Sequence, residues 1–252
     1  MTARSIALAG SVPAETVRRL APLVESLGYR SLWINDTPDG DALAGLAAAA
    51  EVTTTLGLAT GVVPLDRRSG AEIAVRVRDL PADRVRIGVG SGQARHGLDL
   101  LAAGVDELRA GCDVPVVIGA LGPRTRALAA RIADGILFNW LTPAAAADAM
   151  ADLRRDADGR AVEGILYART IASPDARPAL EAEASRYAGY PSYAANFARQ
   201  GADAIDTTID LTAHGSLDAF EVIDELVLRV VTATGSDEEV QSLLHAGAPT
   251  RG

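Results

Sequence analysis

A glycine-bearing turn between an apolar strand and a helix is the first feature of this sequence that could do chemistry. The run from Pro115 to Ile118 is short and apolar, and helical spacing follows from Thr125 to Ala133. Pro123 suits the first helical position, where a backbone N–H would have no partner in any case. Free N–H groups and the positive end of the helix dipole meet at such a turn, which predicts a phosphate site over Gly119 to Pro123. The alternative is that the glycines only permit a tight turn.

Two side chains are candidates for proton transfer. Asp36 follows the apolar run Ser31–Ile34, and His96 follows the glycines of Gly90–Gly92. A carboxyl or imidazole group at such a position could exchange a proton with a bound ligand. The alternative for Asp36 is a cap on the loop or helix that follows it. The alternative for His96 is a solvated loop residue, and we favour that interpretation.

Three further residues carry groups suited to a planar, phosphorylated ligand. Trp140 lies beyond the end of a strand and could flank a ring, whereas alternation places Trp33 in the core. Arg124 opens the helix after the glycine turn and could pair with a phosphate, or be an ordinary surface arginine. Neither interpretation of Arg124 is favoured over the other.

Composition excludes several classes of protein. The chain has 252 residues and a formal net charge of −9, which disfavours a nucleic-acid-binding role. The lone Cys112 rules out an internal disulfide and is expected to be a small buried hydrophobe. The three histidines share no metal-ligand spacing, so no metal site is predicted. The apolar run Ile6–Ala9 is too short for a signal peptide and no run could span a membrane, so we expect a cytoplasmic protein.

Eight short apolar strands, each followed by helical spacing, predict a (β/α)₈ barrel formed by one domain over residues 1–252. An open doubly wound sheet is the alternative. The predicted strands are Ser5–Ala9, Ser31–Ile34, Leu56–Thr60, Val85–Val89, Pro115–Ile118, Ile136–Phe138, Gly164–Ile171 and Glu225–Val231. The predicted helices are Pro13–Leu27, Asp41–Thr55, Gly70–Leu80, Leu98–Ala110, Thr125–Ala133, Pro143–Arg155, Pro178–Ala188, Tyr193–Gln200, one around Ala202–Ala213, and Asp237–His245 with Ser236 as its cap.

A barrel of this kind places its chemistry at the C-terminal ends of the strands. Glycines and small polar groups recur there, and they would let a flat ligand approach the backbone. These ends are Gly10-Ser11, Asn35-Asp36, Gly61-Val62, Gly90-Ser91-Gly92, Gly119–Gly122 and Asn139-Trp140.

Four segments resemble the luciferase-like flavin or deazaflavin oxidoreductases: Leu23–Asp36, Leu56–Val77, Leu80–Gly92 and, most specifically, Val114–Pro143. The resemblance implies an oxidoreductase in which reduced coenzyme F420, or FMN as second choice, acts on a small organic substrate by hydride transfer or monooxygenation. An alanine-rich chain with arginine but no lysine hints at an actinobacterial source, where coenzyme F420 is common. A homodimer is expected from the family alone.

The resemblance also assigns residues. It implies a non-proline cis peptide at Gly61-Val62 behind the middle ring of the cofactor, and it places Asp36 at the ring edge or substrate. Catalytic roles are predicted for Asp36 and His96. With the glycine turn and Arg124 included, the predicted cofactor-binding residues are Asp36, Gly61, Val62, Gly90, Ser91, Gly92, Gly119, Ala120, Leu121, Gly122, Pro123, Arg124, Asn139 and Trp140.

One departure from the family opens an alternative. Only Gln93–Asp113 stands where relatives insert a long segment after the fourth strand. That segment helps to wall the substrate pocket, so its reduction implies a more open site, a completing partner or a barrel without cofactor. The alternative function is therefore a non-catalytic barrel acting as a binding or partner subunit. A Schiff-base aldolase is excluded, because the chain has no lysine.

Overall fold

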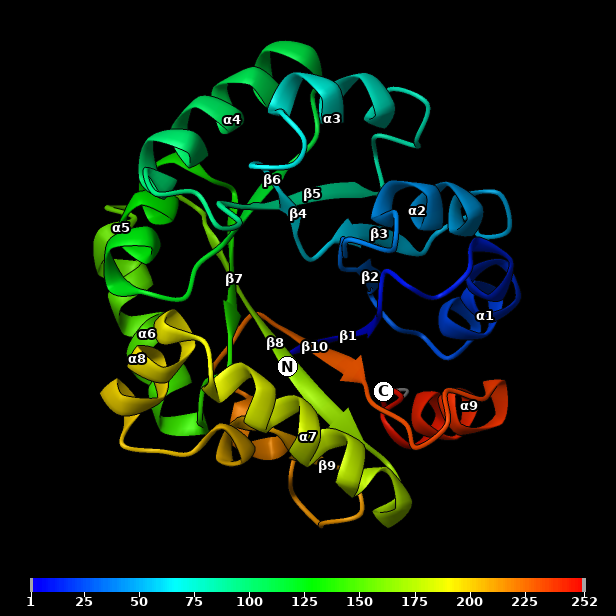
Figure 1. Ribbon diagram of the computed structural model, residues 1–252. Coiled ribbons are helices and arrows are strands. Elements are labelled where there is room, and N and C mark those ends of the chain that lie inside the picture. The colour runs from blue at the N-terminus through cyan, green and yellow to red at the C-terminus, as the bar shows by residue number, and fades with distance from the viewer. Residues whose placement is uncertain (1, 251–252) are drawn as a thin grey trace.

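The computed structural model describes residues 2–250. Within these residues, eight parallel strands form a closed barrel in the order β10-β1-β2-β3-β5-β6-β7-β8, and β10 also pairs with β8. The helices surround the barrel, as the view along its axis shows (Figure 1). The predicted (β/α)₈ barrel is therefore confirmed. Among the described residues, no helix has both the length and the apolar character needed to cross a membrane.

The elements follow the predicted order. The barrel strands are β1 (Ala3–Leu8), β2 (Ser31–Ile34), β3 (Gly57–Thr60), β5 (Val85–Gly90), β6 (Val116–Gly119), β7 (Gly135–Asn139), β8 (Glu163–Ile171) and β10 (Glu225–Val230). Outside the barrel path, β4 (Val63–Pro64) pairs with β5, and β9 (Ile209–Asp210) pairs with β8. The helices are α1 (Ala14–Ser26), α2 (Ala42–Ala50), α3 (Gly70–Val77), α4 (Gly97–Gly111), α5 (Pro123–Ile132), α6 (Pro143–Asp156), α7 (Arg177–Ala188), α8 (Pro191–Gln200) and α9 (Asp237–Ala246). Short 3₁₀ helices span Pro174–Ala176, Ala204–Thr207 and Asp218–Phe220.

Helix boundaries follow local signals where a capping group is present. Pro123 occupies the first turn of α5 as predicted, and Ser236 caps α9 by accepting a hydrogen bond from the Glu239 N–H at 3.3 Å. In α3, Ser69 and Glu72 form a reciprocal capping box.

The helix predicted around Ala202–Ala213 is wrong. That segment forms a 3₁₀ helix and then β9, whose two residues pair with Thr170 and Ile171 at the end of β8. The end of the long β8 has backbone groups that need hydrogen-bond partners. Pairing with them stabilises this segment more than a helix would, because its helical spacing is weak.

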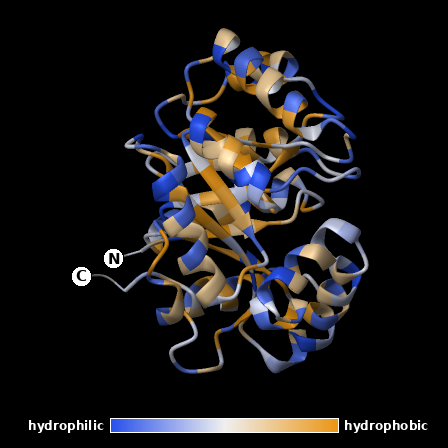
Figure 2. Cartoon of the chain, turned by 90° about the vertical axis from the view of Figure 1, so that its left-hand side faces the viewer, coloured by the Kyte–Doolittle hydropathy of each residue, from blue (hydrophilic) through white to orange (hydrophobic). Residues whose placement is uncertain are grey.

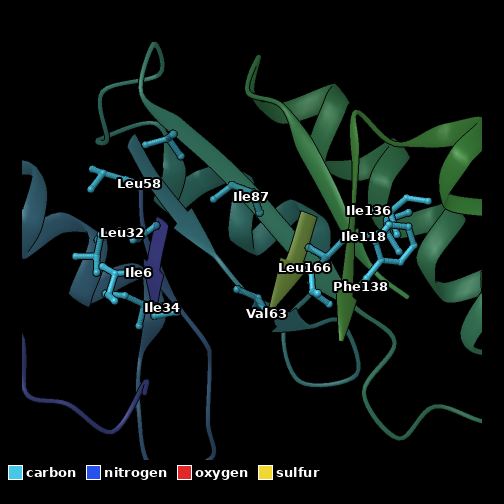
Figure 3. Close-up of a cluster of buried hydrophobic side chains, with 14 of the residues drawn as sticks. Ile6, Leu32, Ile34, Leu58, Val63, Ile87, Ile118, Ile136, Phe138 and Leu166 are labelled. Carbon is cyan, nitrogen blue, oxygen red and sulfur yellow. The ribbon is translucent and has the colours of Figure 1, made fainter. Parts of the chain in front are cut away.

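The hydrophobic core has two layers because the strands are buried on both faces. Outward-facing residues such as Ile6, Leu32 and Phe138 pack between barrel and helices (Figure 3). Inward-facing residues such as Ala7, Trp33 and Val227 fill the barrel. Colouring by hydropathy shows largely apolar strands inside helices that alternate apolar and polar positions (Figure 2).

Alternation sets which polar groups enter the barrel. Tyr167 on β8 faces into the barrel and pairs with Val227 on β10. Because side chains alternate along a strand, the residues two positions before and after each of them also face inward. At the N-terminal end, buried Glu225 accepts hydrogen bonds from Ser5 Oγ at 2.6 Å and Trp33 Nε1 at 2.8 Å. Its Oε2 also lies 2.8 Å from Arg86 Nη2. We call this end the barrel bottom and the C-terminal end the barrel mouth.

Candidate functional site

A cavity of about 660 Å³ lies at the barrel mouth. The ends of β2, β3, β7, β8 and β10 contribute to its lining, and α7 forms its outer wall. Figure 1 shows α7 lying across this end of the barrel beside β8. The cavity thus lies where the (β/α)₈ barrel places functional groups.

Gly61 and Val62 line the cavity between β3 and β4, and they are joined by a cis peptide bond, as the resemblance implied. The Val62 side chain packs into the space left by two glycines. A Cβ on Gly90 would lie 2.7 Å from Val62 Cγ2, and one on Gly119 would lie 2.9 Å from Val62 Cγ1. These glycines are therefore needed to admit Val62, which forms an apolar surface against the cavity.

Asp36 also lines the cavity, but both of its carboxylate oxygens have partners. Oδ1 accepts a hydrogen bond from the Ala42 N–H at 3.1 Å, and Oδ2 lies 3.0 Å from Arg67 Nη2. Its side chain is 3% exposed. These contacts are those of a residue that anchors the start of α2, which is the alternative weighed for it from the sequence. A catalytic role for Asp36 stays a prediction.

His96 is the residue before α4, is exposed and lies outside the cavity lining. The neighbouring Ser91 and Gly92 are also outside it. Gly92 has a φ of 58° and is covered by Asp66, whose Oδ2 accepts a hydrogen bond from the Gln93 N–H at 2.7 Å. The structure therefore brings neither His96 nor this turn to the cavity, and their roles also stay predictions.

The glycine turn before α5 has the form expected of an anion site. Gly122 precedes the helix, no side chain caps it, and no atom lies within 4 Å of where its Cβ would be. Ala120 is buried, whereas Pro123 and Arg124 are exposed. None of the residues from Gly119 to Arg124 lines the cavity. Gly119 packs against Val62, which itself lines the cavity.

Asn139 lines the cavity, whereas Trp140 lies behind its wall. Trp140 is 1% exposed, has a φ of 54° and packs against Tyr187 and Phe197. Trp33 is fully buried inside the barrel, so its predicted place in the core is confirmed.

Sequence reasoning missed the charged groups of the cavity. Arg169 on β8 donates to Glu183 Oε1 from Nε at 3.0 Å and to Asn139 Oδ1 from Nη1. Arg229 on β10 approaches Glu183 Oε2 from the other side, at 3.7 Å. Burial alone would raise the pKa of Glu183, but Arg229 and Arg169 outweigh it and hold that pKa below its usual range.

Aromatic side chains complete this part of the cavity. The Arg169 guanidinium lies 4.1 Å from the centroid of the Trp140 ring and 4.7 Å from that of Tyr187. Tyr167 lines the cavity floor, and its hydroxyl lies 3.5 Å from Asn35 Oδ1. Burial raises the pKa of Tyr167, so its hydroxyl keeps its proton at neutral pH.

A signal for these residues was present in the sequence. Arg169 and Arg229 each interrupt an apolar strand at a position that alternation turns into the barrel. A charged residue there must find a partner or a solvated cavity. No sequence signal marked Glu183. It lies at the mouth because Leu180 and Ala184 pack α7 there, and that packing cannot be read from the spacing of residues in the helix.

Within the described part of the chain, neither the cysteine nor a cluster of possible metal ligands indicates a different chemistry. Cys112 is partly buried, its Sγ contacts the Leu108 carbonyl at 3.3 Å, and burial raises the pKa of its thiol. No group of three or more His, Cys, Asp or Glu side chains within residues 2–250 is arranged to hold a metal ion.

Solved structures share this fold at low sequence identity. The coenzyme F420-dependent tetrahydromethanopterin reductase from Methanopyrus kandleri has a TM-score of 0.73 at 18% identity, with 98% of each chain covered. An F420-dependent secondary alcohol dehydrogenase in complex with an F420–acetone adduct has a TM-score of 0.72 at 15% identity, with 98% of each chain covered. The FMN complex of the oxygenating constituent of 3,6-diketocamphane monooxygenase from the CAM plasmid of Pseudomonas putida has a TM-score of 0.65 at 12% identity, with 99% of each chain covered.

A search of curated protein sequences found no match. The sequence model described as "Luciferase-like monooxygenase" matches residues 2–113 and 105–250, which together span nearly the whole chain. The chain therefore belongs to the luciferase-like monooxygenase family of flavin- and F420-type oxidoreductases.

Proposed function

We propose that this protein is an oxidoreductase that binds coenzyme F420, or alternatively FMN, at the barrel mouth and acts on a small organic substrate. The cavity of about 660 Å³ over Val62 is the observation that carries the proposal. Its volume lies within the range of about 300–1,000 Å³ that is usual for small-molecule sites. Of the residues that the family resemblance assigns to the cofactor, Asp36, Gly61, Val62 and Asn139 line this cavity.

The residues present fit a flavin-type cofactor in two respects. Val62 offers an apolar surface for a ring, and the tight packing of Gly90 and Gly119 holds it in place. The start of α5 has no side-chain cap and open space over Gly122, so its N–H groups are available to a phosphate. When bound, either cofactor supplies hydride in its reduced form, and a reduced flavin can also activate oxygen.

The protein's own groups would orient the ligands and limit water. Asn35 and Asn139 carry amide groups at the cavity edge that suit the polar rim of a ring. Tyr167 keeps its proton, and its hydroxyl donates to Asn35 Oδ1 at 3.5 Å, so it would help to orient that amide toward a bound ligand. α7 covers one side of the mouth, where its Leu180 packs with Ile171 at the end of β8 and with Val231, the residue after β10.

Coenzyme F420 is proposed before FMN on the ground of composition. The composition, with arginine in place of all lysine, fits an actinobacterial source. A homodimer and a cytoplasmic location stay proposals that rest on the family and the composition.

The test is a fluorescence titration of the purified protein with coenzyme F420 and with FMN, each oxidised and reduced. Saturable binding of one is the expected result. Gly122→Asp should weaken that binding at least about tenfold, because it places a negative charge beside the proposed phosphate. Ser236→Asp is the matched control, since it puts the same charge at the start of α9, where Ser236 is already the cap.

Binding of neither cofactor would overturn the proposal. It would favour the alternative, a barrel that acts as a binding or partner subunit. That alternative has one structural observation on its side, because only residues 91–96 connect β5 to α4.

A further inference from the structure

The cavity wall formed by β8, β10 and α7 carries more positive than negative charge. Arg169, Arg186 and Arg229 line it, with Glu183 as the only carboxylate on these three elements at the cavity. On the far side, Asp36 is paired with Arg67 at 3.0 Å, and Asp39, which also lines the cavity, is exposed to solvent. This local excess stands out in a chain whose formal net charge is −9.

Arg169 is fully engaged by the protein. It pairs with Glu183, donates to Asn139 and lies against the rings of Trp140 and Tyr187. Its side chain is 5% exposed. Its contacts are those of a residue that holds the wall together, and it has little capacity left for a ligand.

Arg229 and Arg186 are in a different state. Arg229 donates to the carbonyl of Val230, and its one ion pair, with Glu183, is long at 3.7 Å. Its side chain is only 16% exposed, so water satisfies few of its remaining N–H groups. The Arg186 side chain is exposed, its guanidinium lies 5.4 Å from the centroid of the Tyr187 ring, and among residues 2–250 it has no ion-pair partner. A cation that is largely withdrawn from water is normally paired, so the free donors of Arg229 are suited to an anion in the cavity. Arg186 lines the same cavity and adds a second guanidinium that has no carboxylate partner.

We propose that Arg229 and Arg186 bind a carboxylate group of the substrate, and that the rings of Tyr187 and Tyr193 contact its apolar body. The two rings lie 4.8 Å apart between centroids, and both line the cavity beside the arginines. The substrate class is therefore a carboxylic acid with an aromatic or unsaturated body. The identification of this ligand as the substrate rests on the proposed function, whereas the anion site does not depend on it.

The experiment uses benzoate and its uncharged counterpart benzamide as probes, titrated into the protein without cofactor and followed by calorimetry or protein NMR. Benzoate should bind saturably and at least about tenfold more tightly than benzamide. Arg229→Met should remove about tenfold to a hundredfold of the benzoate affinity, as expected for hydrogen bonds to a charged group. Glu183 keeps Arg169 as its partner in this variant, so the fold should persist.

Two further variants keep the test decisive. Arg186→Met changes an exposed residue, cannot unfold the protein through a lost ion pair, and should also weaken benzoate binding. Arg155→Met is the control, because Arg155 is an exposed arginine of α6 whose partners are Asp152 and Asp156. It should leave benzoate affinity unchanged.

Equal affinity for benzoate and benzamide, or benzoate binding that neither Arg229→Met nor Arg186→Met weakens, would overturn the proposal. A phosphate of the cofactor is the other source of an anion, and comparing FMN with riboflavin separates the two. If Arg229→Met weakens FMN but not riboflavin, the arginines serve the cofactor and the substrate assignment is wrong. If neither cofactor binds but benzoate binding depends on Arg229, the oxidoreductase proposal fails and the anion site stands.

Discussion

The two ends of the barrel interior contain the same kinds of charged group in different proportions. At the barrel bottom, Arg30 and Arg86 meet Glu163 and Glu225 in ion pairs of 2.6 to 3.3 Å, so cations and carboxylates are equal in number. At the barrel mouth, the wall formed by β8, β10 and α7 carries three arginines and one carboxylate, Glu183, while Asp36, paired with Arg67, and Asp39 line the opposite side. The balanced end is therefore suited to holding the strands together, and the unbalanced end to receiving a ligand.

Cavity volume alone does not distinguish the two ends. A groove of about 660 Å³ also lies at the barrel bottom. Its arginines are paired, however: Arg154 lies 2.8 Å from Asp224, and Arg30 lies 2.6 Å from Glu163. The feature particular to the mouth is a set of guanidinium donors without matching acceptors.

The largest effect is expected at the barrel bottom. Glu225→Ala would leave the largely buried Arg86 with Glu163 as its remaining ion-pair partner and would deprive Trp33 Nε1 and Ser5 Oγ of their acceptor. Breaking a buried pair from one side costs about 3–5 kcal/mol. Urea unfolding should show a loss of that order.

The counterpart at the mouth is Arg229→Met, for which we expect a loss of about 1 kcal/mol or less. Arg229 is held by one long ion pair, and Glu183 keeps Arg169. Equal losses in Glu225→Ala and Arg229→Met would contradict the division into a structural and a ligand-binding end.

An intermediate effect is expected at the cavity floor. Gly90→Ala would place a Cβ 2.7 Å from Val62 Cγ2 and push Val62 toward the cavity. Such overpacking costs about 1–3 kcal/mol, and the variant should also bind the cofactor more weakly. Gly122→Ala is a suitable stability control, since its Cβ would meet no atom within 4 Å. A Gly90→Ala protein as stable as the control would show that Val62 is not held by this packing.

The smallest effect concerns pH. The pKa of Glu183 in the folded protein lies below its ordinary value of 4.5, because Arg229 and Arg169 outweigh the effect of burial. A carboxylate with a lowered pKa stabilises the fold fully above its unfolded pKa and loses that contribution as the pH falls through the folded value. The free energy of unfolding should therefore decline less steeply below pH 4.5 in Glu183→Gln than in the unchanged protein. If the free energy of unfolding falls equally steeply below pH 4.5 in both proteins, Glu183 is not paired as the structure shows.

The sequence by itself determined the barrel and much of its local structure. Short apolar strands alternating with helices specify it, and Pro123 and Ser236 mark helix starts because their side chains suit those positions regardless of the rest of the fold. Strict alternation in β8 and β10 also places Arg169 and Arg229 inside the barrel. These features depend on neighbouring residues along one element, so sequence spacing suffices to predict them.

Only the tertiary structure decided which of these groups are available for chemistry. Asp36 lies at a strand end as predicted, yet Arg67 and the start of α2 occupy both of its oxygens. Glu183 reaches the mouth because α7 packs across it, and there it holds Arg169 closely and Arg229 loosely. Whether a charge is paired depends on distances between elements remote in sequence, which side-chain packing sets to within about an ångström.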